Sequence, residues 1–210
     1  MQIDPGPQTF AQNYRLTTGL VVPRPIAWIT SLSSNGKVNL APFSGFTFCC
    51  HKPPMVTVAM GLREHGGFKG QIKDSVVNIL HNREFVANIA DRSLLGPLHA
   101  SSAAYPPHQS EVEALGLETC ASTVVKTPRL AAAPAALECR LHSMIELGEE
   151  GDRIMIGQVV MFQVADRLIQ DGKVDTRALD PIARLGGPNY ATFGEIVTMP
   201  AAEVPASAAI

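Results

Sequence analysis

The sequence predicts a mainly β fold with a few helices, in which antiparallel strands form a closed or partly closed barrel. Between Pro25 and Ser44, an apolar run leads into Asn35-Gly36, a pair typical of β-hairpin turns, and then into a second run. Further on, residues 136–147 alternate apolar and polar side chains and lead through a glycine-containing turn into a long strand, residues 153–165. Few stretches have helical character, so the pattern favours an antiparallel barrel over a parallel sheet.

The remaining elements follow in a definite order. Asn35-Gly36 predicts a type I′ turn, whose two central residues both need a positive φ. Asn39 to Ser44 then leaves the return strand, because Pro42 cannot donate a ladder hydrogen bond. The other expected elements are an arm (1–14), strands 44–50 and 55–60, a glycine-rich loop (61–70), a helix capped by Asp74 (75–82), a strand (85–89), helices 93–103 and 111–115, and a loose tail (201–210). Gly157 inside the last long strand indicates a bulge or a barrel corner.

Length and composition limit the classes of protein. The chain has 210 residues, which fits one domain over residues 1–210 with a core from about 15 to 199. The formal net charge is −2 and no run of Lys or Arg stands out, so nucleic acid is not an expected partner. The N-terminus lacks the features of a signal peptide, and no apolar run approaches the ~18 residues of a spanning helix. We therefore expect no membrane association and a cytoplasmic location.

Several kinds of site are also excluded. The four cysteines form no C-x-x-C pair, and Cys49 and Cys50 would point to opposite faces of a strand, so no metal site is expected. The glycine-rich motifs of dinucleotide-binding and P-loop proteins are absent, as are the signatures of zinc proteases and α/β-hydrolases.

One group of residues favours a planar, phosphorylated ligand. They share hydroxyl, amide or cationic side chains placed at strand ends or at a helix start, where free N–H groups attract anions. These residues are Thr30, Ser31, Asn39, Ser44, Lys73 and Ser75, with Arg63 or Lys69 as further cations. Taken alone, the Lys73-Asp74-Ser75 segment is more typical of a simple capped helix start.

A second group lies at Arg184-Leu185-Gly186-Gly187 and Tyr190. Arg184 supplies a fixed fork of donors, the glycines permit a close backbone approach, and Tyr190 offers a ring and a hydroxyl. The alternative is a surface turn with a structural arginine. Trp28 is the only tryptophan, and it either lies against an aromatic ligand or belongs to the core.

Together these segments resemble the flavin reductase-like family, the FMN-binding split barrels with a Greek-key-like antiparallel barrel. The likeness covers roughly residues 15 to 195, and the Arg-Leu-Gly-Gly…Tyr ending is most similar to the flavoredoxin-like branch. The matching segments are 24–29, 39–44, 73–75 with 78–79, 84–88, 101–106, 137–139, 156–160 and 184–190.

The resemblance implies a homodimer with FMN near the subunit interface. It implies that Thr30, Ser31, Lys73 and Ser75 hold the phosphate and that Asn39 to Ser44 lies along the isoalloxazine. The full set of implied FMN-binding residues is Trp28, Thr30, Ser31, Asn39, Leu40, Ala41, Pro42, Ser44, Arg63, Lys73, Ser75, Arg184 and Tyr190. Two positions depart from the family pattern, with Ser75 where Thr is common and Arg153 where many reductases carry His.

The implied activity is that of an FMN-binding oxidoreductase, an NAD(P)H-dependent flavin reductase that transfers hydride to the flavin N5. FMN, or FAD or riboflavin as a substrate, would carry the chemistry, so no catalytic side chain is required. Reduced flavin would then serve a second flavin, a partner monooxygenase or an electron-transfer protein. The alternatives are a flavoredoxin-type electron carrier with tightly bound FMN, which Arg153 favours, and a flavin-binding barrel without turnover.

Overall fold

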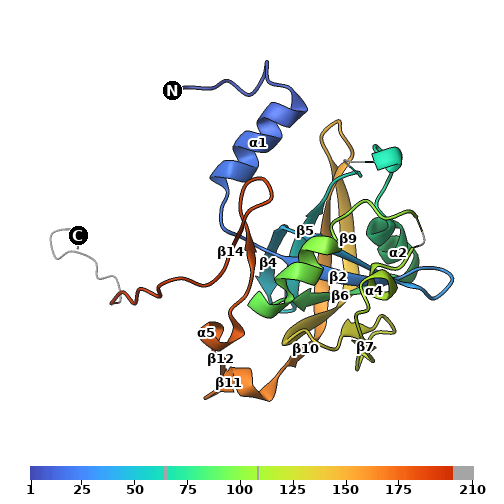
Figure 1. The fold of residues 1–210 in the computed structure, drawn as a ribbon, viewed down its shortest axis with the longest axis vertical. Coiled ribbons are helices and arrows are strands. Elements are labelled where there is room, and N and C mark those ends of the chain that lie inside the picture. Colours follow the sequence, from blue (N-terminus) through green and yellow to red (C-terminus); the bar gives the residue numbers. More distant parts are fainter. Residues whose placement is uncertain (64–65, 108, 201–210) are drawn as a thin grey trace.

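A computed structural model, which describes residues 1–63, 66–107 and 109–200, has a curled antiparallel sheet at its centre (Figure 1). Its strands have the spatial order β3-β2-β6-β9-β10-β5-β4. The bounds are β2 (Ala27–Leu32), β3 (Val38–Phe43), β4 (Gly45–His51), β5 (Pro54–Met60), β6 (Glu84–Ile89), β9 (Ala135–Leu147) and β10 (Asp152–Val164). The two edge strands, β3 and β4, are separated in sequence by Ser44 alone, yet they do not pair with each other. The sheet is therefore an incompletely closed barrel, as the sequence predicted.

Short elements surround this sheet. The helices are α1 (Phe10–Leu20), α2 (Asp74–Asn82), α3 (Leu95–Ala100), α4 (Glu111–Ala114) and α5 (Thr176–Leu179), with 3₁₀ turns η1 (Gly66–Phe68), η2 (Arg92–Leu94) and η3 (Asp166–Leu168). Three small sheets join β1 (Arg24–Pro25) to β13 (Ala183–Arg184) and β14 (Tyr190–Ala191), β7 (Thr119–Cys120) to β8 (Arg129–Leu130), and β11 (Ile169–Gln170) to β12 (Lys173–Val174). Among the helices of the described residues, none is long and apolar enough to cross a membrane.

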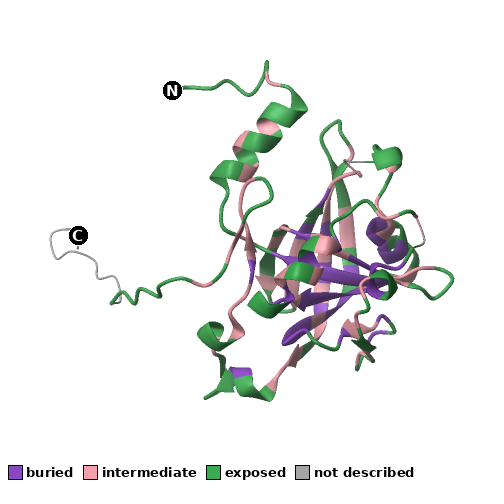
Figure 2. Ribbon diagram, viewed as in Figure 1, coloured by how far each residue is buried: buried purple, intermediate pink, exposed green. Residues whose placement is uncertain are grey.

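The alternation of side chains along β2 divides the apolar residues into two cores. Ala27 and Ile29 face the barrel interior, where α2 closes one end by packing Val76 and Ile79 into the same core. Trp28 faces the other way and belongs to a second core, between the sheet and α3 and α4. Figure 2 shows that the buried residues gather on the central strands and on α2.

The predicted hairpin is confirmed, but the predicted type I′ turn is wrong. Only Gly36 has a positive φ, of 81°, whereas a type I′ turn needs two such residues. The Gly36 N–H instead donates to Ser33 O, and Ser33 N–H donates to Lys37 O, so the loop is one residue longer than a two-residue turn. The return strand also continues further than predicted, because β3 pairs with β2 as far as Phe43 opposite Ala27. Pro42 is tolerated there since β3 is an edge strand.

Other boundaries differ from the predictions as well. The predicted arm contains α1, whose N-terminus forms a reciprocal capping box between Thr9 and Gln12. Asp74 is the first residue of α2 rather than its N-cap, which is Lys73. The helix expected over 93–103 is a 3₁₀ turn followed by α3, which ends at Ala100. The predicted tail, residues 201–210, lies outside the described residues.

Loop 122–128 is held by two carboxylates of the sheet. Glu138, which is fully buried, accepts hydrogen bonds from the N–H groups of Thr123, Val124 and Val125, at 2.8, 2.6 and 3.2 Å. Glu84 accepts from the next two N–H groups, at 2.8 and 2.9 Å. Burial alone would raise the pKa of Glu138. The hydrogen bonds from these N–H groups and from the Gln163 side chain lower this pKa by a larger amount, so the net shift is downward.

Gly157 marks the predicted irregularity in β10. The pairing of β9 with β10 shifts register between Ile156 and Gly157, which confirms a bulge. A Cβ atom at Gly157 would lie 2.4 Å from Cζ of Phe85, a fully buried ring of the barrel core. Glycine at this position therefore makes room for the Phe85 ring.

We expect Gly157→Ala to destabilise the protein by about 1–3 kcal/mol or more, because the methyl group overpacks a core that cannot easily shift. Gly96→Ala in α3 is the matched control, since nothing lies within 4 Å of the added Cβ there. Chemical denaturation measures both variants, and the control should be neutral or stabilised by about 0.5–1 kcal/mol. Equal stability of the two variants would contradict a packing role for Gly157.

Candidate functional site

The open edge of β3 joins two groups of polar side chains. At its Val38 end β3 meets α2 and the segment before α4, and just beyond its Phe43 end Ser44 contacts Arg24 of the small sheet of β1, β13 and β14. A strand rises about 3.3 Å per residue, so Asn39 and Ser44 are about 16 Å apart along the edge. The candidate site consists of these two ends and the strand edge between them.

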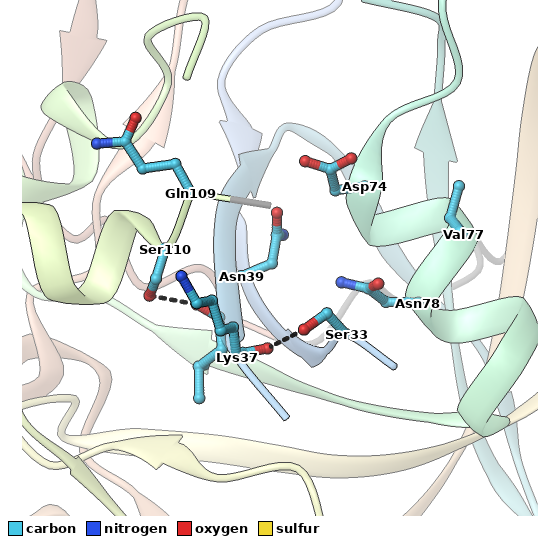
Figure 3. A pocket seen from close by; sticks show the side chains of 9 residues that line it. Ser33, Lys37, Asn39, Asp74, Val77, Asn78, Gln109 and Ser110 are labelled. Carbon is cyan, nitrogen blue, oxygen red and sulfur yellow. Dashed lines mark hydrogen bonds between the residues drawn. The ribbon is translucent and has the colours of Figure 1, made fainter. Parts of the chain in front are cut away.

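Four buried side chains meet at the end beside α2. Asn39 Nδ2 donates to Ser75 Oγ at 2.9 Å, and Asn78 Nδ2 donates to Ser31 Oγ at 3.2 Å. They converge because Ser31 ends the interior face of β2, while Ser75 and Asn78 are three residues apart and share one face of α2. A small pocket of about 30 Å³ opens beside Asn39 and Asn78. Figure 3 shows these two side chains among those that line it. Its lining residues are Ser33, Lys37, Val38, Asn39, Asp74, Val77, Asn78, Gln109 and Ser110.

Two cations stand beside the start of α2, and one of them reaches towards the other end of β3. Arg63 forms an ion pair with Asp74 at 2.7 Å and donates to Tyr105 O at 3.1 Å. Its Nε is buried and has no hydrogen-bond partner among the described residues, so one cationic donor is left over. Lys73 Nζ lies 5.3 Å from the centre of the Phe43 ring, at the start of α2. An orphaned cationic donor, an ammonium and the N-terminus of a nine-residue helix are suited to an anionic group.

Arg24 organises the opposite end. Its Nε donates to Ser44 Oγ at 3.3 Å, and its Nη2 donates to Leu185 O at 3.0 Å. Its Nη1 donates to Thr18 O and Val21 O at 2.7 and 2.6 Å. One guanidinium thus ties the end of β3 to the end of α1 and to the Arg-Leu-Gly-Gly segment, a set of contacts that a single ammonium could not make.

Arg184 and Tyr190 contact each other. The Arg184 guanidinium lies 4.6 Å from the Tyr190 ring centre and donates to the Tyr190 hydroxyl, which also lies 3.0 Å from His99 Nδ1. In the strand register, Arg184 lies directly opposite Arg24 on one side and Tyr190 on the other. These three side chains therefore share one face of the small sheet. The opposite face borders a pocket of about 350 Å³, lined by Pro23, Pro25, Pro181, Ile182, Ala183, Ala191, Thr192, Phe193 and Gly194.

The structure brings together most, but not all, of the residues that the sequence singled out. One end collects Ser31, Asn39, Arg63, Lys73 and Ser75, and the other collects Ser44, Arg184 and Tyr190. Ala41 and Pro42 lie on β3 between them.

The side chains of Trp28, Thr30 and Leu40 are fully buried. Thr30 Oγ1 donates to Pro128 O at 2.7 Å, on the face of β2 opposite to Ser31. Trp28 Nε1 donates to Ser101 Oγ at 2.9 Å, within the second core. Trp28, Thr30 and Leu40 therefore pack on the face of β2 and β3 away from Ser31, and the hydroxyls of Thr30 and Ser31 point to opposite faces of the sheet.

Sequence reasoning missed Arg24, Asp74, Asn78 and Glu111 as parts of the site. Arg24 stood directly before the predicted strand, and Asn78 stood one turn after Ser75, so helical spacing could have indicated that position. Asp74 was treated only as a cap. Glu111 accepts a hydrogen bond from Leu40 N–H at 2.8 Å, a contact 71 residues apart in sequence that no local pattern reveals.

Comparison with known proteins identifies the family. The sequence profile described as "Flavin reductase like domain" matches residues 19–176. The chain belongs to the flavin reductase-like family. The family predicted from the sequence is thereby confirmed.

Solved structures of this family agree with the fold. Nitrilotriacetate monooxygenase component B from Bacillus cereus is 35% identical, with a TM-score of 0.89 over 95% of this chain and 98% of that one. The 2-nitrobenzoate 2-nitroreductase NbaA of Pseudomonas fluorescens is 32% identical, with a TM-score of 0.87 over 99% and 100% of the two chains. A flavin reductase-type split-barrel protein from Shewanella frigidimarina shares the fold at 22% identity, with a TM-score of 0.82 over 96% and 100%. The predicted split barrel is confirmed, and the protein is a flavin-related oxidoreductase.

The donor set of the site fits FMN. An anionic phosphate suits the cations and free N–H groups at the α2 end, and the length of the β3 edge suits an extended ribityl chain and ring. The pocket at the α2 end has room for about two water molecules, so the chain by itself does not enclose a flavin there. Among the described residues, no group of His, Cys, Asp or Glu side chains is arranged to hold a metal ion.

Proposed function

We propose that this protein is an FMN-binding, NAD(P)H-dependent flavin reductase. The observation that carries the proposal is the free edge of β3, with an anion-binding cluster at one end and the Arg24–Ser44–Leu185 contacts at the other. Bound FMN would supply N5 as a hydride acceptor, with a dihydronicotinamide as the two-electron donor and solvent as the source of the second proton, so the products would be oxidised nicotinamide and reduced flavin. Free FAD or riboflavin is a further candidate substrate.

The chain's own residues would bind and orient the flavin. Ser31, Lys73 and Ser75 would hold the phosphate, and the orphaned Arg63 Nε would add a cationic donor. Asn39 would fix Ser75 through the hydrogen bond between their side chains. Along the edge, Ala41 and Pro42 would lie beside the ring. Trp28, Thr30 and Leu40 would keep the two strands in register from the second core.

At the Ser44 end of β3, the flavin ring would contact side chains that are already held in place by hydrogen bonds. Ser44 is held by Arg24, and Arg184 is held by Tyr190, so these side chains are preorganised before any ligand binds. A preorganised set of donors can stabilise the negative charge that builds up on a reduced flavin. No general acid or base is needed for hydride transfer itself, so we assign no catalytic side chain.

We also propose that the protein is a homodimer. Helix α1 has no buried residue, although Phe10 and Tyr14 stack on its surface, and an isolated eleven-residue helix is only marginally stable in water. The edge strand β4 exposes Phe48 by 67%, and β10 exposes Phe162 by 57%. A second copy of the chain would cover such surfaces and would deepen the shallow site.

One observation favours the electron-carrier alternative. Arg153, at the position where many reductases carry His, forms an ion pair with Glu146 at 2.7 Å and donates to Gly151 O at 2.7 Å. Its guanidinium is therefore occupied and would not help to place a nicotinamide. Similarity to a monooxygenase component supports a partner monooxygenase, or an electron-transfer protein, as the recipient of the reduced flavin. We propose that this exchange takes place in the cytoplasm.

Anaerobic mixing of the FMN-loaded protein with NADH or NADPH tests the activity. We expect one of the two donors to bleach the flavin absorbance and, in air, to be oxidised continuously. A yellow protein that neither donor reduces, but that a ferredoxin-type carrier reduces, would refute the reductase and favour the electron carrier.

Arg184→Ala should lower turnover or flavin affinity, because the Arg184–Tyr190 contact beside the proposed ring position is lost.

Lys73→Ala combined with Ser75→Ala should weaken FMN binding about 10- to 100-fold, because charge-assisted hydrogen bonds to the phosphate are lost. Riboflavin affinity should change little, since riboflavin has no phosphate. Lys173→Ala, an exposed lysine in β12, is the matched control. Unchanged FMN affinity in the double variant would place the phosphate elsewhere.

Light scattering of the eluted protein should give a mass of twice the 22.4 kDa chain. Phe10→Ser with Tyr14→Ser should shift the protein towards monomer, because these rings form the exposed stack of α1. Val174→Ser, another exposed apolar residue, is the control. A monomeric wild-type protein at micromolar concentration would contradict the dimer.

A further inference from the structure

Glu111 lies against the free edge of β3. Its Oε2 accepts from Leu40 N–H at 2.8 Å, and the preceding Ser110 Oγ donates to Val38 O at 2.6 Å. Alternate residues of a strand direct their N–H groups to the same edge, and the next position after Leu40 on this edge is Pro42, which has no N–H. The start of α4 thus takes the place of a neighbouring strand along one part of the edge, beside the part where the proposed flavin would lie.

The carboxyl group of Glu111 is buried, since the residue is only 7% exposed. Among the described residues, Asp74 and Arg63 are the charged groups that act on it from the elements packed against it, and they oppose each other. Burial raises the pKa of Glu111 to about 7, against the opposing effect of the N–H groups of Leu40 and of Glu111 itself. Glu111 therefore changes its charge near neutral pH.

We propose that Glu111 is a positioning residue for the flavin, which holds β3 at Leu40 and takes up a proton when a phosphorylated flavin binds at the start of α2. This inference rests on the proposed function, and it adds a residue and a proton to that site.

The effect of Asp74 shows that charge at the start of α2 reaches Glu111. Asp74 opens α2, lies between Lys73 and Ser75, and acts on Glu111 electrostatically. A phosphate placed there adds negative charge near an ionised Glu111, which favours the neutral form of the carboxyl group. By linkage, the FMN-bound protein holds more protons than the free protein, so FMN affinity falls as the pH rises through the Glu111 titration. Riboflavin has no phosphate and should show little of this effect.

The test compares dissociation constants of FMN and riboflavin between about pH 6.5 and 8.5, above the second phosphate pKa of roughly 6. For the wild type, the ratio of the FMN constant to the riboflavin constant should rise several-fold over this range, because a shift of one pKa unit changes a linked equilibrium by up to about tenfold. Glu111→Gln should flatten this rise, since its amide oxygen can still accept from Leu40 N–H. Glu113→Gln, exposed on the same helix, is the control and should behave like the wild type.

Calorimetry in buffers of different ionisation enthalpy measures the proton directly on the wild-type protein, even if Glu111→Gln fails to fold. FMN binding near pH 7 should take up a fraction of a proton, and riboflavin binding should take up less. A pH-independent ratio, or equal proton uptake for both flavins, would overturn the role of Glu111 while FMN binding stood. If neither flavin binds at any pH, the proposed function itself fails.

Discussion

Much of this structure follows from one constraint, which is that the backbone groups along the free edge of β3 need partners although no strand pairs there. The two edges of the curled sheet, β3 and β4, are consecutive in sequence, yet they do not pair, so the barrel stays open. In most sheets an open edge of this kind is a liability, because it can pair with another chain. Here side chains from Ser110 and Glu111 bind part of the edge, Pro42 removes one donor, and the remainder faces the candidate site.

The same edge explains how the two ends of the site are held. Both are built from groups that are already hydrogen-bonded within the protein, so a ligand would meet a preformed surface instead of ordering one. At the α2 end the bonds run between strand and helix through Asn39 and Asn78, and at the other end they run through a single guanidinium. Two elements distant in sequence, α1 and the Arg-Leu-Gly-Gly segment, depend on Arg24 for their position. Loss of this one side chain would therefore disturb both the wall of the site and the helix beside it.

The sequence predicted the barrel, its hairpins and its family because these depend on local patterns. Alternation along residues 136–147 and the Asn35-Gly36 signal are readable without knowledge of the remaining chain. The boundary errors have local causes too: Gly36 alone takes the positive φ, and Pro42 is accepted at an edge that a sequence cannot distinguish from a central strand. Helix α1 was missed because it buries nothing, so it has no apolar stripe towards a core.

The residue types of the candidate site could be predicted from the sequence. The face of the sheet to which each side chain points was not recognised. Thr30 and Ser31 are neighbours in sequence, and strand geometry sends their hydroxyls to opposite sides of the sheet. Glu111 and Arg24 depend on long-range contacts, to Leu40 and Leu185, which no spacing rule contains. The resemblance to the family supplied the ligand, whereas the three-dimensional structure supplied the partners of each side chain.

The loop that Glu84 and Glu138 hold has a consequence for strand alignment. Five consecutive N–H groups, from Thr123 to Thr127, point at these two carboxylates, one on β6 and the other on its neighbour β9. A slip of one residue in either strand would turn its carboxylate to the other side of the sheet and leave the loop's donors unsatisfied. The loop thus favours the native register of the β6–β9 pair, because a misaligned pair would leave several donors of the loop without acceptors.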